Sequence, residues 1–244
     1  MTAQIQSLKL DGVKTETAQS KWNWLYKIGG AAALLSLVFF PIQIMVFLVN
    51  PPPDSVIGWF QLFQDNPLVG LLDLDLLLIV DQVLAILIFL ALYAALRRAQ
   101  ESFMEISLAL GLVSIVLFIA SNPAFAMLSL SDQYAAATSD AQRAVFLAAG
   151  QAALITWQGS AFQVSYLLGS IAAIILSAVM LRSRLFSKAT AYLGILANVI
   201  ALGLYVPVIG IYISIFSVVF LWVWYLLIAC RLFQLGRAVP EIAE

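Results

Sequence analysis

Asp81 is the residue of this chain whose position most clearly invites chemistry. It lies near the middle of an apolar stretch, Pro67–Leu96, and no apolar stretch of the chain contains a Lys, Arg or His that could neutralise it. An ionisable side chain at the centre of a membrane helix costs about 2.5–3.5 kcal/mol, which makes Asp81 a candidate functional residue. Its carboxyl group could hold a proton, a cation or a hydroxyl-bearing ligand. Alternatively, it stays protonated and joins helices through a hydrogen bond.

Most other polar side chains of the apolar stretches fall in the outer half of the expected spans. Asn198 lies near the midplane. The candidate ligand-binding residues are Asp81, Asp73, Gln43, Asn122, Gln158, Gln163 and Asn198. Polar groups at membrane depth need partners or water, so this clustering predicts a polar pocket that opens outward and closes near Asp81. The alternative is that these side chains only form hydrogen bonds between helices. Asp75 points away from Asp73 around a helix, so we expect it to face another neighbour or the lipid headgroups.

Several kinds of catalytic chemistry do not fit this composition. The chain has no histidine and a single cysteine, Cys230, which excludes His-ligated metals and His-dependent nucleophiles. Asp73, Asp75 and Asp81 share one expected helix, whereas an intramembrane aspartyl protease would bring its aspartates from different helices. No phosphate-binding glycine loop or metal-ligand cluster is recognisable. We therefore expect no enzymatic activity, no cofactor and no metal.

The composition is that of a polytopic membrane protein. Hydrophobic residues make up 63% of the chain and charged residues only 10%, compared with about 45–50% and 25% in soluble domains. A helix of about 20 apolar residues crosses a bilayer. Two further segments, Ser55–Phe63 and Ser139–Ile155, are expected to be helices on the outer surface. The six expected spans are Ile28–Val49, Pro67–Leu96, Phe103–Leu130, Gly159–Leu181, Ala189–Pro207 and Gly210–Arg231.

Basic residues predict the orientation of this all-α bundle. All of the Lys and Arg residues except Arg143 fall on one side if both termini are cytoplasmic, as the positive-inside rule requires of the cytoplasmic side. The expected organisation is a polar cytoplasmic tail (1–21), one six-helix transmembrane domain (22–237) and a short cytoplasmic tail (238–244). The net charge of −1 argues against nucleic acid as a partner.

Two further sequence segments are distinctive: the run Leu72–Asp81 with the Tyr93…Leu96-Arg97 helix end, and Arg182–Lys188 followed by Gly194-Ile195. These segments resemble a family of bacterial membrane proteins known as domain of unknown function 4386. The resemblance extends from about Ile28 to Arg237. It implies six helices in a bacterial cytoplasmic membrane, and it implies no activity for any residue.

Two functions remain open from the sequence. In the first, the protein binds or moves a small ligand, a cation or a proton through an outward-facing polar pocket around Asp81. In the second, it is a non-catalytic accessory subunit whose apolar faces pack against partner membrane proteins. The lipid bilayer is the partner that both functions share.

Overall fold

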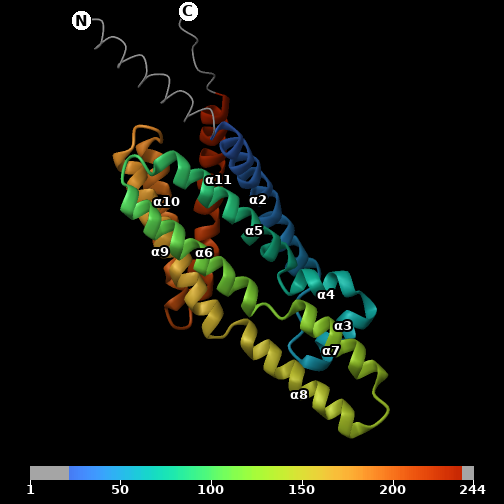
Figure 1. The fold of residues 1–244 in the computed structure, drawn as a ribbon. Helices are drawn as coiled ribbons and strands as arrows, with labels where there is room; N and C mark the ends of the chain where they lie inside the picture. The colour runs from blue at the N-terminus through green and yellow to red at the C-terminus, as the bar shows by residue number, and fades with distance from the viewer. Residues whose placement is uncertain (1–21, 238–244) are drawn as a thin grey trace, which may run out of the picture.

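The computed structural model describes residues 22–237, and the regular structure of this range is helical, without a strand. Six segments are long and apolar enough to cross a bilayer, which confirms the predicted all-α, six-helix fold class. The tails predicted at 1–21 and 238–244 lie outside the described residues. The six segments include the helices α2 (Asn23–Val49), α5 (Leu76–Leu96), α6 (Glu101–Ser121), α9 (Ser160–Arg182), α10 (Lys188–Ala201) followed by the short 3-10 helix η1 (Leu202–Tyr205), and α11 (Gly210–Arg237) (Figure 1). Two of the segments, Glu101–Ala136 and Asp140–Arg182, each contain one further helix, described below.

Successive spans run in opposite directions, so the charged residues separate to the two ends of the bundle. The start of α2 and the ends of α5, α9 and α11 meet at one end (Figure 1). The basic end, as we call it, carries Lys27, Arg97, Arg98, Arg182, Arg184, Lys188, Arg231 and Arg237. Arg143 lies at the opposite end, as the sequence predicts. The predicted alternation of the six spans is thus present in the structure.

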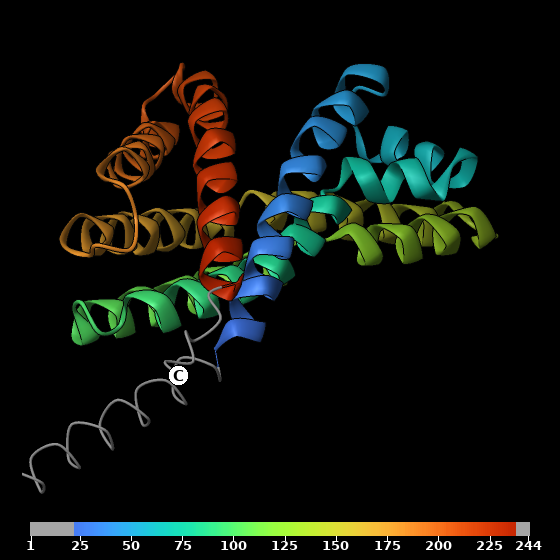
Figure 2. The same ribbon diagram turned by 90° about the horizontal axis from the view of Figure 1, so that it is seen from above.

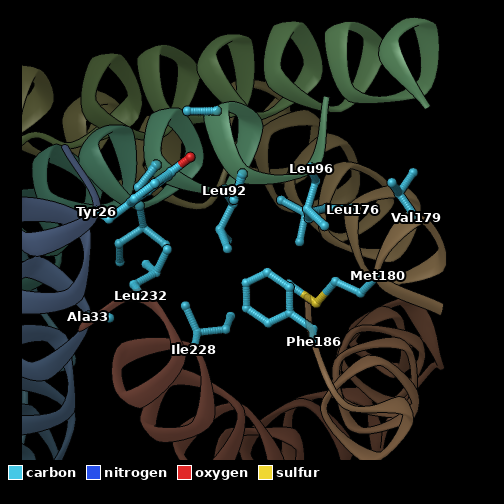
Figure 3. Close-up of a cluster of buried hydrophobic side chains, with 14 of the residues drawn as sticks. Tyr26, Ala33, Leu92, Leu96, Leu176, Val179, Met180, Phe186, Ile228 and Leu232 are labelled. Atoms are coloured by element: carbon cyan, nitrogen blue, oxygen red, sulfur yellow. The ribbon is translucent and has the colours of Figure 1, made fainter. Parts of the chain in front are cut away.

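The packed core of the bundle lies toward the basic end. Side chains from α2, α5, α9 and α11 point toward one another there (Figure 3). Leu92, Leu176, Met180, Ile228 and Leu232 are among its most deeply buried members. Burying apolar surface between helices closes this end of the bundle by close packing.

Small residues let the helices approach closely. Gly29 of α2 faces Ala91 of α5, and a Cβ atom added at Gly29 would lie 2.4 Å from the Ala91 Cβ. Such a distance is far below van der Waals contact, so only glycine permits this crossing. Viewed from above, α2 and α11 cross over the other spans (Figure 2).

The predicted span Pro67–Leu96 is not one continuous helix, and this prediction is corrected. It contains α4 (Pro67–Asp73) and α5, separated by Leu74 and Asp75. Asp75 has a φ of 64°, in the left-handed region that Asp tolerates better than most residues. The chain changes direction there, and the membrane span begins at Leu76.

The predicted span Phe103–Leu130 is interrupted in the same way. α6 ends at Ser121, and α7 (Ala124–Ala136) begins after Asn122-Pro123. Proline has no N–H to continue the helical ladder, so it starts a new helix. The Asn122 amide holds the interruption: its Nδ2 donates to the Leu74 carbonyl (2.7 Å), and its Oδ1 accepts from the Ala124 N–H (2.9 Å).

Four short helices form a cap at the end opposite the basic end: α3 (Val56–Asp65), α4, α7 and α8 (Asp140–Trp157). They enclose a second apolar cluster that contains Trp59, Phe60, Phe63 and Met127. The expected surface helix Ser55–Phe63 is confirmed as α3. The segment predicted to be helical at Ser139–Ile155 is helical as α8. α8 continues the line of α9 and runs antiparallel to α7, so the two project from the bundle (Figures 1 and 2).

Candidate binding cavity

A cavity of about 390 Å³ lies inside the six-helix bundle, between the packed core and the cap. Its walls come from α5, α6, α9, α10 and α11, and Phe40 of α2 completes them. On α5 the lining begins at Asp75, next to the cap, and ends at Leu92. On α11 it runs from Ser214 to Tyr225 and leaves the basic third of the helix to the packed core. The cavity therefore extends from the cap past Asp81 to Leu92, about three helical turns farther toward the basic end than the predicted closure near Asp81.

Asp81 lines this cavity from the second turn of α5. The side chain is 5% exposed, and its Oδ1 atom has no hydrogen-bond partner. The Ser36 hydroxyl approaches it from α2 but is itself left without a partner in hydrogen-bond geometry. Tyr225 of α11 lies within electrostatic reach of the same carboxyl group. Among residues 22–237, no Lys or Arg lines the cavity to supply a positive charge for Asp81.

Asp75 lies at the cap end of the cavity, outside the span Leu76–Leu96. Its Oδ2 accepts a 2.9 Å hydrogen bond from the Trp157 indole of α8. Trp157 packs edge-on against Trp59 of α3, with ring centroids 6.2 Å apart. Burial raises the pKa of Asp75 to about 6; the charge of Asp73 adds to this, and the Trp157 hydrogen bond opposes it. Asp75 thus joins the cap to the cavity wall.

Serine hydroxyls in the wall already use their protons on backbone carbonyls. Ser114 donates to the Ser165 carbonyl (2.7 Å), Ser165 to the Phe162 carbonyl (2.7 Å) and Ser217 to the Ser214 carbonyl (2.6 Å). A hydroxyl that has spent its one donor can offer a ligand only its lone pairs. The Asn198 amide nitrogen is likewise engaged, with the Gly194 carbonyl at 2.8 Å. The three hydroxyls therefore offer a ligand only acceptor oxygens.

Two features add to this acceptor lining. The first is a set of aromatic rings, among which Phe118, Phe162 and Tyr166 stack successively with centroids 6.1 Å apart. The second is a buried donor, because the Trp224 indole N–H has no partner. The aromatic residues of the wall are Phe40, Phe89, Phe118, Phe162, Tyr166, Trp224 and Tyr225.

Of the seven candidate residues from the sequence, the structure brings Asp81 and Asn198 to the cavity. Gln43 is buried away from it and donates to the Leu72 carbonyl (3.0 Å). Asn122 braces the junction of α6 and α7. Gln158 is exposed between α8 and α9, where its carbonyl accepts from the Gln163 amide (3.4 Å).

Asp73 is the remaining candidate, and it is fully buried at the end of α4. Neither of its carboxyl oxygens has a hydrogen-bond partner, and it does not line the cavity. Burial raises its pKa to about 6. Asp73 and Asp81 therefore do not share one cavity, contrary to expectation, because the break at Asp75 turns α4 away from the line of α5.

Sequence reasoning missed Asp75, Tyr166 and the serines of the wall. Asp75 was expected to face away, since an unbroken helix would place it opposite Asp73. The serines gave no signal, because serine is equally common where helices merely pack. The Tyr166 hydroxyl forms a hydrogen bond with Ser214 across α9 and α11.

The described residues, 22–237, contain no cluster of three or more His, Cys, Asp or Glu side chains that could hold a metal ion. The cavity wall combines two carboxyl groups with hydroxyl and amide groups, the Trp224 indole N–H and aromatic rings. Comparison of the sequence with known proteins found no matching family model, no matching curated protein and no matching solved structure.

Proposed function

We propose that this chain is an integral membrane protein that binds a small lipophilic cation in its central cavity, with Asp81 as the countercharge. The observation that carries the proposal is the Asp81 carboxyl group, which lines a cavity of about 390 Å³ and has one oxygen without a partner. A buried polar group without a partner destabilises the folded protein. A bound cation would offset that cost.

The charge of the wall supports a cation over an anion or a neutral sugar. Asp75 and Asp81 are its ionisable carboxyl groups, and no Lys or Arg faces them. The serine and asparagine oxygens extend the same preference, since they accept hydrogen bonds from an ammonium or hydroxyl group.

The shape and the aromatic lining support an organic cation over a bare metal ion. Pockets for small organic ligands have volumes of about 300–1,000 Å³ and mostly apolar walls. Aromatic faces attract organic cations most strongly where water is excluded. Tyr225, which lies near Asp81, contacts Phe40 in an edge-on arrangement with centroids 6.3 Å apart. Such rings could surround the apolar part of the ligand beside its charge.

Orientation is part of the same proposal. The positive-inside rule would put the basic end, and both termini, in the cytoplasm of a cell bounded by this membrane. The cavity, which lies nearer the cap, would then face outward. The resemblance to the family of unknown function 4386 stays a prediction and contributes no activity.

The accessory-subunit alternative would require Asp81 to be satisfied by the protein itself. Gln43, Asn122 and Gln163 fit that alternative, because each is hydrogen-bonded to a backbone carbonyl. Asp81 fits it less well, since none of its described neighbours donates to Oδ1. A proton could neutralise Asp81 in the empty cavity, and ligand binding would then release it.

The experiment measures binding of radiolabelled tetraphenylphosphonium to the purified protein in nanodiscs. We expect saturable binding that Asp81→Asn weakens by at least about thirtyfold, because that change removes the charge partner of a desolvated cation. Asp65→Asn, an exposed position in the cap, is the matched control and should leave binding unchanged. Triphenylphosphine oxide, a neutral molecule with similar rings, should not compete. Equal binding by wild type and Asp81→Asn would contradict the proposal.

A further inference from the structure

A second cavity, of about 320 Å³, opens at the basic end of the bundle. It lies where the start of α2 meets the ends of α5, α9 and α11. Four arginines line it, two from the end of α5 (Arg97 and Arg98) and two from the end of α9 (Arg182 and Arg184). The helix ends that form this cavity are far apart in sequence, so the fold brings the four positive charges together.

Among residues 22–237, no Asp or Glu lines this cavity to balance its positive charge. In the part of the chain that the structure describes, the arginines that donate side-chain hydrogen bonds are Arg143 and Arg231, neither of which belongs to the cavity. Like charges held together at the end of a bundle repel one another, so a bound anion would stabilise this arrangement.

The cavity also has an ordered apolar side. The Arg97 guanidinium group lies over the Trp22 ring, 5.2 Å from its centroid, which fixes the arginine by a cation–π contact. Tyr26, Ala94, Ala95 and Leu235 supply further uncharged wall. A group with a charged head and an apolar continuation would therefore match both parts.

We propose that this arginine cavity binds a phosphate-bearing anion. Guanidinium groups donate paired hydrogen bonds that match phosphate oxygens, and four of them converge here. Basic pockets between spans are known sites for anionic lipid headgroups. The phosphate could belong to such a headgroup or to a free phosphate ion. This site is separate from the cation site, and neither proposal depends on the other.

The alternative explanation for anion binding is a non-specific attraction between anions and the whole basic end. The chain offers a control that separates this attraction from binding in the cavity. Lys188 and Arg237 are exposed at the same end but do not line the cavity. The double variant Lys188→Gln/Arg237→Gln removes the same charge as Arg98→Gln/Arg184→Gln. Only the second pair should matter if the cavity itself binds.

The experiment titrates the purified, delipidated full chain in neutral detergent with dioctanoyl phosphatidylglycerol, dioctanoyl phosphatidylcholine and inorganic phosphate, by calorimetry. We expect phosphatidylglycerol to bind more tightly than phosphatidylcholine. Arg98→Gln/Arg184→Gln should weaken its binding about thirtyfold, since each basic residue contributes about fivefold, and the control pair should weaken it by less than about threefold. Inorganic phosphate that competes at similar concentration would support the site and assign it to the free ion; weak competition would assign it to the lipid.

Two results would overturn the proposal. One is equal binding of both lipids together with no binding of inorganic phosphate. The other is an equal loss of affinity in the cavity variant and the control variant. If Arg98→Gln/Arg184→Gln fails to fold, as judged by circular dichroism and gel filtration, the lipid preference of the wild type decides.

Discussion

Asp75 offers a direct test of how the cap is joined to the cavity. We expect Asp75→Asn to make the protein more stable than wild type at pH 8 and to change its stability little at pH 4. Asparagine tolerates the left-handed backbone of this position nearly as well as aspartate. It also keeps an Oδ1 acceptor for the Trp157 indole. The substitution therefore removes the charge with little other change.

The size and sign of the effect follow from the pKa of Asp75, which burial raises from 3.8 to about 6. A raised carboxyl pKa means that the folded protein holds the proton more tightly than the unfolded chain does. The stabilisation is complete below pH 3.8 and is lost as the pH rises through about 6. A pKa raised from 3.8 to about 6 corresponds to a change of about 3 kcal/mol in the free energy of unfolding.

The assay measures the apparent melting temperature of both proteins in one detergent between pH 4 and pH 8. The melting temperature of Asp75→Asn minus that of wild type should rise with pH and level off above about pH 6. Asp65→Asn, whose carboxyl is exposed in α3, should show a flat difference. A flat or falling difference for Asp75→Asn would refute the inference that a carboxylate is buried at this junction.

Two further predictions concern packing and topology. Gly29→Ala should lower the melting temperature by an amount equivalent to about 1–3 kcal/mol, because its Cβ would collide with Ala91; Gly29→Ala/Ala91→Gly should recover most of the loss, and failure to recover would contradict this contact. In a Cys230→Ala background, cysteines at Thr138 and at Ser187 should react with an impermeant thiol reagent from opposite sides of the membrane, and same-side labelling would contradict the six-span topology.

The number and direction of the spans could be predicted because they depend on composition averaged over about 20 residues. The two interruptions could not be predicted in this way. The apolar leucines on both sides of Asp73 and Asp75 continue the hydropathy of the span, and the break there depends on the φ angle of Asp75. Asn122-Pro123 was noticed as a polar point, but hydropathy continues across it into α7. Both breaks separate cap from bundle, so missing them also hid the cap as a structural unit.

The candidate site could be predicted in position more readily than in its members. Asp81 and Asn198 were found because a polar side chain at depth is unusual in either span. The serines of the cavity wall carry no such mark, since a serine also suits close helix packing. Asp75 was misplaced for a geometric reason: its direction was computed on a helix that the structure interrupts at that residue.

Several polar side chains that do not line the cavity form hydrogen bonds with backbone carbonyls near helix interruptions. Pro41 cannot donate to the Leu37 carbonyl one turn earlier, and the Trp222 indole of α11 donates to that carbonyl instead (2.8 Å). Asn122 does the same for the Leu74 carbonyl beside the break between α4 and α5. Gln43 donates to the Leu72 carbonyl, which also accepts from the Asp75 N–H (3.1 Å).

Gln163 serves the carbonyl of Gln158 between α8 and α9. An unpaired carbonyl within a bilayer costs several kcal/mol, so Asn122, Gln163 and Trp222 are each accounted for by the helix interruption beside them. No helix interruption of this kind explains Asp81. It lies within a continuous helix. A carboxylate has no proton to donate to a backbone carbonyl, and no group donates to the Asp81 Oδ1 atom. Hydrogen bonding to backbone carbonyls therefore does not explain Asp81, and its carboxyl group in the cavity wall is the group that a bound ligand would explain.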